Sequence, residues 1–492
     1  MTKHNGKKLM AVGALALMMQ ACAIPLLNFK KADTTLPASY ANSAQNAKTE
    51  EGLKQDTPQD TTNEANINWK EFFEDPYLSG LIDVAIVNNK EVNIMAQRIN
   101  IAKNEIQARK GEYLPFVNFG AGADVGKVGR YTRNGAVEES LDIKEGKAFP
   151  DPLANYQFGL YSSWELDVWK KLRNATKVAG LEYMASIEGK NFLITNLVAE
   201  IANAYYELTA LDNQALNLEQ NIQIQRNALE VTSQLQKYGR ATSLAVKRFE
   251  AEVKKNESKQ YVIKQQTVEV ENRINFLLGR VPQPIQRASA EFMAMKLKMV
   301  QAGIPSQLLE NRPDIRKAEL ELAASDLNIK VAKANFYPSF TIRAGLGFEA
   351  FNPKYLLSTP ESLMFSLAGD MMAPLINRNA ITAVYKNANS RQIQAAYAYE
   401  QTIISAYGEV SNQVSSIDNL EKNYQLKSAQ VNALTESVDV ANQLFQSARA
   451  DYLEVLLTQR EALEAKTELI ETKQKQITAM VGLYRALGGG WK

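Results

Sequence analysis

Two stretches of the chain carry apolar residues at the spacing of a long, packed helix. From Ile194 to Ile222 and from Leu420 to Phe445, apolar side chains recur at steps of three and four, with one charged exception in the second stretch. Sustained spacing of this kind is typical of coiled-coil packing. Residues 172–237 alone would form a helix about 100 Å long at about 1.5 Å per residue. The pattern therefore predicts helical rods, which a compact domain does not need.

Four other segments alternate apolar and polar side chains, as β-strands with two different faces do. They lie at 117–125, 157–166, 340–349 and 363–370. Segments of about 9–11 residues fit transmembrane strands, but a half-buried strand of a soluble sheet alternates in the same way. Four strands cannot close a membrane barrel, whose usual minimum is about eight. Either the sheet is soluble, or several copies of the chain pool their strands above a hollow tube of helices. In the second case, the polar faces would line the lumen through Asn118, Asp124, Glu165, Arg343 and Glu349.

The helices and strands are arranged as two copies of one plan. Residues 88–119 match residues 311–342, and the two segments contain Tyr-Leu-Pro and Phe-Tyr-Pro at corresponding places. Further along, Leu244 matches Leu453. The repeated order is helix, strand, strand, long helix, helix.

The first 22 residues have the features of an exported leader. Lys3, Lys7 and Lys8 precede an apolar run at 9–19. That run is too short to span a bilayer, which needs about 20 apolar residues. It ends just before Cys22, and the junction resembles a bacterial lipobox, in which the signal is cut before the cysteine and the thiol carries lipid. The alternative is ordinary signal-peptidase cleavage beside an incidental cysteine.

The chain thus divides into four parts. The segment after the leader is rich in Ala, Thr, Asn, Gln and Asp and is expected to form an extended tether. The predicted parts are a signal peptide at 1–21, a lipidated N-terminal tether at 22–68, a first repeat at 69–282 and a second repeat at 283–492.

Charge and rare residues narrow the function. The chain has 56 Lys+Arg against 54 Asp+Glu, a balance that gives no reason to expect nucleic acid as a partner. Its one histidine and one cysteine, His4 and Cys22, both lie in or at the end of the leader. A mature chain that starts at Cys22 cannot use histidine catalysis, a cysteine nucleophile, a disulfide or a His/Cys metal site. We therefore expect no enzyme activity, no metal and no cofactor other than the covalent lipid on Cys22.

One methionine cluster suggests a further role. Met293, Met295 and Met299 are soft thioethers of a kind that can hold Cu(I). The alternation of Met293 and Met295 also fits the buried face of a short strand, which is the favoured interpretation. Copper or silver export is accordingly a subsidiary hypothesis.

Two motifs carry a resemblance to a known family. The chain contains GIPSQLLENRPDI at 303–315 and ends with LYRALGGGW at 483–491 before the last lysine. Together with the duplicated plan, they resemble the TolC-like outer-membrane efflux factors, most closely the lipoprotein (NodT-type) branch that serves resistance-nodulation-division pumps.

The resemblance implies a mixed, mainly α fold. In that fold, a homotrimer forms a transmembrane β-barrel with four strands per chain, which continues into a long periplasmic α-helical barrel with an equatorial collar. It also implies a lipid-anchored location in the outer membrane. The implied partners are a periplasmic adaptor protein and an inner-membrane efflux pump.

The implied function is the exit duct of a tripartite pump, which passively conducts small toxic compounds to the exterior. The alternatives are the exit duct of a protein-secretion system, the outer-membrane component of copper or silver efflux, and a structural envelope protein that conducts nothing.

By the same resemblance, the turns at 238–243 and 447–452 are the periplasmic tips of the long helices. The residues expected to face the adaptor are Tyr238, Gly239, Arg240, Thr242, Ser447, Arg449 and Asp451.

The helix after the second turn matches the constriction of the family. Leu453 occupies an apolar ring position and Arg460 a basic one, while Leu457 stands where the family usually has Asp. Glu454 is the candidate acid in its place. We call Leu453, Glu454, Leu457 and Arg460 the predicted periplasmic gate. The alternative is that the two leucines only pack in the helical seam.

Overall fold

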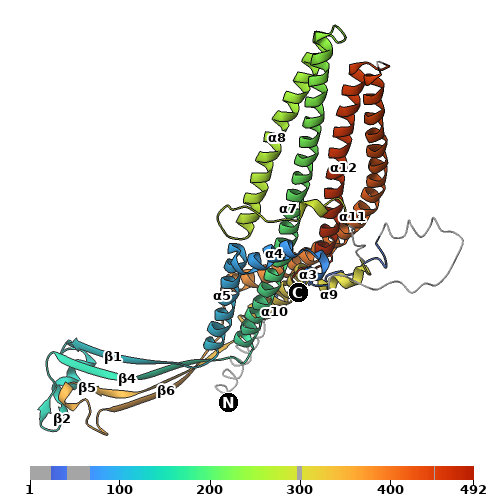
Figure 1. Ribbon diagram of the computed structural model, residues 1–492. Helices are drawn as coiled ribbons and strands as arrows, with labels where there is room; N and C mark the ends of the chain where they lie inside the picture. Colours follow the sequence, from blue (N-terminus) through green and yellow to red (C-terminus); the bar gives the residue numbers. More distant parts are fainter. Residues whose placement is uncertain (1–23, 41–66, 296–301, 448, 492) are drawn as a thin grey trace. The chain divides into compact units, whose positions relative to one another are not determined.

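The computed structural model describes residues 24–40, 67–295, 302–447 and 449–491 (Figure 1). The chain folds into two compact units, and each unit draws on both repeats. Cys22 and the predicted signal peptide at 1–21 lie outside the described residues. The first unit holds the described residues of 1–31, 100–183 and 320–396, and the second unit holds those of 32–99, 184–319 and 397–492.

Four long helices form two hairpins. The long arms α7 (Lys171–Lys237) and α11 (Asn379–Gln446) have 67 and 68 residues, and the return arms α8 (Ser243–Leu277) and α12 (Tyr452–Ala486) have 35 each. Figure 1 shows α7 returning as α8 and α11 returning as α12. At about 1.5 Å per residue, α7 and α11 are each about 100 Å long, which confirms the predicted rods.

The apolar seams differ between the two hairpins. On α7 the seam is the buried face, where Ile201 and Leu208 are fully covered. On α11 the predicted seam is covered less completely, because Val431 is buried while Tyr424 and Phe445 stay half-buried. The second hairpin therefore leaves apolar surface that its own described residues cover only in part.

All four predicted strands are present in the first unit. They are β1 (Phe116–Gly126), β4 (Leu153–Leu166), β5 (Ser339–Ala350) and β6 (Leu363–Met372). They pair antiparallel in the order β1-β4-β5-β6. The predicted alternation is therefore that of one four-stranded sheet, and β1 and β6 are its edges.

Shorter elements complete the chain and preserve the repeated plan. The order α5, β1, β4, α7, α8 in the first half recurs as α10, β5, β6, α11, α12 in the second. The helices before the strands are α3 (Trp69–Phe73), α4 (Pro76–Asn88), α5 (Lys90–Glu112), α9 (Leu308–Asn311) and α10 (Pro313–Ala334). The loop elements are α6 (Arg133–Ser140), β2 (Asp142–Lys144), β3 (Lys147–Ala148), η2 (Ser289–Glu291), η3 (Pro305–Gln307) and η4 (Pro353–Tyr355).

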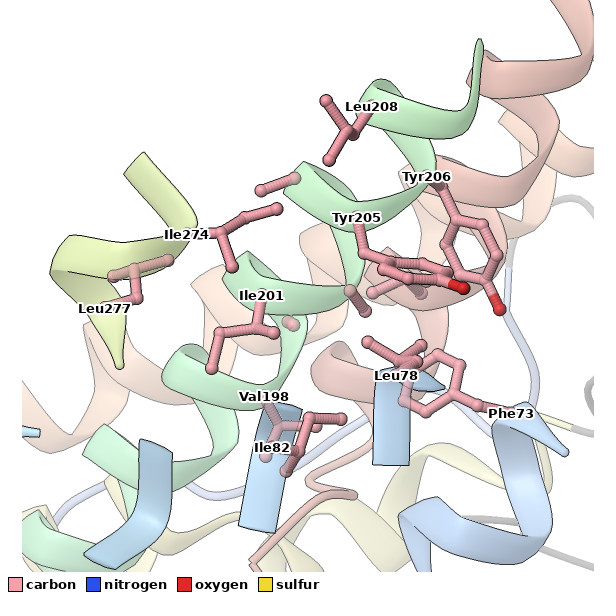
Figure 2. Packing of buried hydrophobic residues seen from close by; sticks show 14 of the residues in the cluster. Phe73, Leu78, Ile82, Val198, Ile201, Tyr205, Tyr206, Leu208, Ile274 and Leu277 are labelled. Atoms are coloured by element: carbon pink, nitrogen blue, oxygen red, sulfur yellow. The ribbon is translucent and has the colours of Figure 1, made fainter. Parts of the chain in front are cut away.

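The main hydrophobic core lies in the second unit, where the short N-terminal helices pack on the long ones. Figure 2 shows Phe73 of α3 and Leu78 of α4 beside Tyr205 and Tyr206 of α7, and Ile82 of α4 beside Val198 of the same long helix. Leu78 and Ile82 are fully buried. Burial raises the pKa of the Tyr206 hydroxyl well above its ordinary value, with a smaller contribution from the nearby carboxylate of Asp75. This core fixes the base of the α7–α8 hairpin.

The described part of the predicted tether, residues 24–40, forms no helix or strand and is bound at several points along its length. The Lys30 N–H donates to Gln392 Oε1 at 3.2 Å, and Gln392 Nε2 donates to the Lys30 carbonyl at 2.7 Å. Nearer the end of this part, the Tyr40 ring stacks on Tyr407 with centroids 5.5 Å apart. The side chains of α11 therefore bind this segment.

The prediction of a short strand at the methionine cluster is wrong. The N–H of Phe292 donates to the Ser289 carbonyl, and the N–H of Ala294 donates to Glu291. These bonds to the third preceding residue form helical turns, so the alternation of Met293 and Met295 does not describe a strand. Both side chains are partly buried against the main core, and Met299 lies outside the described residues.

Candidate functional site

One face of the sheet carries an apolar row that crosses all four strands. The register pairs Phe119 with Leu160, Leu160 with Leu346, and Leu346 with Phe365. These side chains are 69%, 51%, 56% and 80% exposed, in that order along the row. A contiguous exposed apolar surface marks contact with a membrane or a protein. This face therefore needs an apolar environment that the described chain does not supply.

One aromatic pair adds to the same surface, and a second lies just beyond the strands. The rings of Phe158 and Phe348 stack with centroids 5.4 Å apart. Just beyond the ends of β4 and β5, Trp169 stacks on Tyr337 at 4.7 Å, and its indole N–H donates to the Pro338 carbonyl at 2.7 Å. Amphipathic rings of this kind are enriched where hydrocarbon meets water at a membrane surface.

The opposite face of the sheet is polar and internally bonded. Arg343 forms an ion pair with Asp370 at 3.2 Å, and Asn155 donates to Glu349 at 2.8 Å. Between these contacts the register aligns Gly120, Gly159 and Gly347, and the Tyr161 ring lies over Gly120 and Gly345. The register places all five predicted lumen residues on this face: Asn118, Asp124, Glu165, Arg343 and Glu349.

An N-terminal cap joins the sheet to α7. The buried carboxylate of Asp167 accepts hydrogen bonds from the backbone N–H groups of Leu172 and Arg173, both at 2.9 Å. The Arg173 guanidinium adds an ion pair at 3.0 Å. Burial alone would raise the pKa of Asp167, but these hydrogen bonds and the Arg173 charge hold it below its ordinary value. The strand therefore continues into the rod through a charged, fully bonded cap.

The first hairpin tip is a glycine-terminated helix end. Gly239 has φ +70°, its N–H donates to Gln236, and the Arg240 N–H donates to Leu235. This pair of bonds is the Schellman arrangement, which favours glycine because only glycine lacks the Cβ penalty at positive φ. Thr242 then caps α8 by accepting the N–H three residues ahead at 3.2 Å.

The second tip has a different chemistry. The Arg449 N–H donates to the Leu444 carbonyl at 2.8 Å. Asp451 stands at the N-cap of α12, as expected from sequence, but its side chain makes no capping hydrogen bond, unlike Thr242. The residues predicted to face an adaptor all lie at these two turns and are exposed: Tyr238, Gly239, Arg240, Thr242, Ser447, Arg449 and Asp451.

The leucines of the predicted periplasmic gate do not lie on the buried face of α12. The first turns of that helix bury Val455 and Gln459, each 2% exposed, whereas Leu457 is 37% exposed and Leu453 is half-buried. Residues at 453 and 457 are four apart and share one side of the helix. In the described chain, this side is separate from the buried seam, and the role of both leucines in closure stays a prediction.

The two charged members of the gate are exposed and do not face each other. Glu454 and Arg460 are six residues apart, so their side chains point about 120° apart around the helix. Among the described residues, neither forms an ion pair. A pair between the Glu454 and Arg460 positions therefore requires a second copy of the chain.

The sequence profile of the outer membrane efflux protein family matches residues 81–280 and 304–489. The chain belongs to this family. The resemblance read from the sequence is confirmed, together with the mainly α fold class and its four-stranded sheet. The protein is an outer-membrane efflux channel component, and its family is one of membrane transport proteins.

Curated relatives of this efflux protein cover most of its length. Over 424 residues it is 26% identical to the pyoverdine export outer membrane protein OpmQ of Pseudomonas aeruginosa, covering 86% of this chain and 87% of that protein. It is 28% identical to the solvent efflux pump outer membrane protein SrpC of Pseudomonas putida, with 86% and 87% covered. The probable outer membrane lipoprotein SilC of Salmonella typhimurium is 26% identical, with 86% and 88% covered.

Solved structures share the fold. The outer-membrane channel OprN superposes with a TM-score of 0.80 at 23% identity, covering 96% of this chain and 99% of that one. The open state of the MtrE outer membrane channel of Neisseria gonorrhoeae gives 0.81 at 20% identity, with 96% and 99% covered.

In the described part of the efflux protein, no helix is both long enough and apolar enough to cross a bilayer. In the same residues, no three His, Cys, Asp or Glu side chains are grouped so that they could hold a metal ion.

Sequence reasoning missed a buried arginine that fastens the second hairpin of the efflux protein. Arg312, only 4% exposed, donates to both carboxylate oxygens of Asp314 at 3.0 and 2.7 Å, to Glu409 at 2.9 Å and to the Ala486 carbonyl at 2.9 Å. Burial alone would lower the pKa of the Arg312 guanidinium, but the two carboxylates hold it above its ordinary value. The arginine sits inside the motif at 303–315, and its position before Pro and Asp was the available signal.

Proposed function

We propose that the protein, as a homotrimer, is the exit duct of a tripartite efflux pump and passively conducts small toxic compounds to the exterior. The observation that carries the proposal is the sheet, which has one exposed apolar face, one polar face and two open edges. An unpaired strand edge cannot face hydrocarbon, because its N–H and C=O groups would have no partner there.

The open edges of β1 and β6 require strands from other copies. Three copies of four strands make a ring of twelve, above the minimum of about eight that closes a membrane barrel. In such a ring, the apolar row of Phe119, Leu160, Leu346 and Phe365 faces lipid, and the polar face lines the duct. The incompletely covered seam of α11 supports the same assembly, since neighbouring copies can cover it.

Small molecules are the favoured cargo. Two of the relatives are named for pyoverdine export and for solvent efflux, and another for toluene efflux. Among the described residues, no contact favours protein secretion or a metal, since Met293 and Met295 pack against the core.

The partners we propose are a periplasmic adaptor protein and an inner-membrane pump. The exposed tips at Tyr238–Thr242 and Ser447–Asp451 supply the adaptor surface, which offers an aromatic ring, two arginines and hydroxyl groups within two short turns.

A lipid on Cys22 completes the proposal by anchoring the mature chain to the outer membrane, as in the NodT-type branch. Two or more acyl chains give a stable anchor. Intact-mass measurement of the purified protein should show the mass of the lipid on a chain that starts at Cys22. A free thiol, or cleavage at another residue, would refute this part.

The duct is tested by single-channel conductance in planar bilayers. The parent protein should conduct, and Leu453→Ala should raise the conductance, because shorter side chains weaken a hydrophobic constriction that closes by dewetting. Leu244→Ala is the matched control, since Leu244 is the counterpart of Leu453 in the first repeat and is 58% exposed.

A parent that does not conduct would refute the duct. An equal rise in both variants would show that Leu453 has no special place in the constriction, and no change in either would place the seal at other residues.

A further inference from the structure

Two loops from different repeats meet at one end of the sheet. The β2–β3 hairpin lies in the connection between β1 and β4, and η4 lies in the connection between β5 and β6. Since α5 and α10 lead into the sheet and α7 and α11 lead out of it, both connections lie at the end away from these helices (Figure 1). If the apolar face spans the outer membrane, as proposed above, this end lies at the outer surface.

Three lysines converge there on two aromatic rings. The Nζ atoms of Lys144 and Lys354 lie 4.4 and 4.7 Å from the ring centroid of Tyr355. Lys147 Nζ lies 4.9 Å from the centroid of Phe351 and 5.9 Å from that of Tyr355. We call these five residues the lysine–aromatic cluster.

The cluster holds an uncompensated positive charge. In the described chain, none of its three ammonium groups forms an ion pair with a carboxylate. Its neighbours on the same loop are paired, since Lys127 lies 3.1 Å from Asp151 and Arg130 lies 3.8 Å from Glu139. The attraction of ammonium groups to ring faces offsets only part of their mutual repulsion. An anion bound between the lysines would offset the repulsion that remains.

The positive charge of the cluster also affects the acidity of Tyr355. The neighbouring Lys354 ammonium, together with the charges of Lys144 and Lys147, holds the pKa of Tyr355 below its ordinary value. The ring itself is half-buried, so it fixes where the lysines gather.

We propose that the lysine–aromatic cluster binds a phosphate group, supplied by the headgroup of an anionic glycolipid in the outer leaflet or by free phosphate. Phosphate fits because each lysine brings a compact charge with three N–H donors, and a phosphate offers several oxygens to several such donors at once.

The level of the cluster favours the lipid source. The last pair of β5 with β6 is Phe348 with Leu363, and Phe351 and Tyr355 follow in the connection directly after β5. Aromatic rings and lysines directly beyond an apolar band lie where lipid headgroups are found. This placement rests on the proposed membrane orientation, whereas the charge cluster itself does not.

The test measures phosphate binding to the full-length protein in lipid nanodiscs. The test variant is Lys147→Gln/Lys354→Gln, and the control is Lys127→Gln/Arg130→Gln, which removes the same charge from the same end of the sheet. The first probe is fluorescent, diphosphorylated lipid A at a few per cent of a phosphatidylcholine disc. The second probe is inorganic phosphate in solution, used as a competitor. Each variant is first checked for assembly and channel conductance equal to the parent.

We expect the test variant to bind lipid A about tenfold more weakly than the parent, since each surface lysine contributes to holding an anionic headgroup. The control should bind as the parent does. Displacement of lipid A by millimolar phosphate would identify free phosphate as a competent ligand, and lack of displacement would identify the lipid headgroup; both support the site. Equal binding by both variants, or an equal loss in both, would overturn the proposal. Because conductance is measured separately, a failure here leaves the duct function standing.

Discussion

An arginine scan along β5 tests which face of the sheet meets lipid. Leu346 and Ile342 lie on the apolar face, and Thr341 lies on the polar face between Glu165 and Asp370 in the register. Leu346→Arg and Ile342→Arg would place a charge in hydrocarbon. Thr341→Arg is the matched control, because it introduces the same side chain one residue away and beside two carboxylates.

The expected free-energy cost of each arginine follows from the depth of its residue in the membrane. The middle of β5 lies between Ala344 and Gly345, so Leu346 is about 5 Å from it and Ile342 about 8 Å, at about 3.3 Å per residue. With a strand tilt of about 45°, these distances become depths of about 4 and 6 Å from the midplane. An arginine costs about 2–4 kcal/mol at the midplane and about 0–1 near the interface, which lies about 12 Å away.

We therefore expect Leu346→Arg to cost about 2–3 kcal/mol per chain and Ile342→Arg about 1–2 kcal/mol, by interpolation over depth. Thr341→Arg should change stability by less than about 1 kcal/mol, as exposed charge pairs do. The assay is urea-dependent folding into lipid vesicles, followed by the fraction of heat-resistant oligomer on a gel.

Two results would refute the assignment of the faces. If Thr341→Arg and Leu346→Arg lowered the free energy of unfolding equally, the two faces would have the same environment, either both lipid or both water. A larger cost at Ile342 than at Leu346 would place the membrane midplane elsewhere on the strand.

Three further predictions test the helical parts, the first of them with a control variant. Arg312→Met should destabilise the protein by about 2–3 kcal/mol in urea unfolding, because it leaves the partly buried carboxylates of Asp314 and Glu409 and the Ala486 carbonyl without their donor; Arg226→Met, at an exposed pair, should cost less than about 1 kcal/mol. Asp167 has a folded-state pKa below the unfolded value of about 3.9, so its stabilisation is present above that pH and is lost as the pH falls through the folded pKa. Asp167→Asn should therefore lower stability at pH 7 by about 1–2 kcal/mol and flatten the acid limb of a pH series, whereas an unchanged acid limb would show that another group controls it. Gly239→Ala should cost about 1 kcal/mol at its positive φ and speed hydrogen exchange at that tip about fivefold; unchanged exchange would show that the tip relaxes without strain.

The long helices and the strands were predictable because their patterns depend only on local periodicity. The 3/4 spacing of α7 and the alternation of β1 report burial on one face, and burial is what shapes those sequences. The strand predicted at the methionine cluster was wrong because periodicity was the only signal used for it. Met293 and Met295 alternate like a strand, but hydrogen bonds to the third preceding residue determine the local backbone, and no periodicity reports them.

The contacts that join distant segments were out of reach of the sequence. Arg312 was visible in its motif, yet its bonds to Glu409 and the end of α12 depend on packing across nearly a hundred residues or more. Lys144 and Lys354 belong to different repeats, so only the pairing of β4 with β5 brings their loops together. The gate leucines remain a prediction, since the closure they would form needs three copies.

The matched arm lengths of the two hairpins restrict how a duct of this kind can change in evolution. α7 and α11 differ by one residue, and α8 and α12 are equal in length. A seven-residue insertion lengthens a helix by about 10 Å, so a lengthened arm would shift the register against its partner unless that partner gained the same insertion. Keeping both tips level then needs a second matched pair of insertions in the other hairpin. The length of the helical tube can therefore change only when all four long helices gain or lose residues together. The side chains along these helices can diverge one at a time.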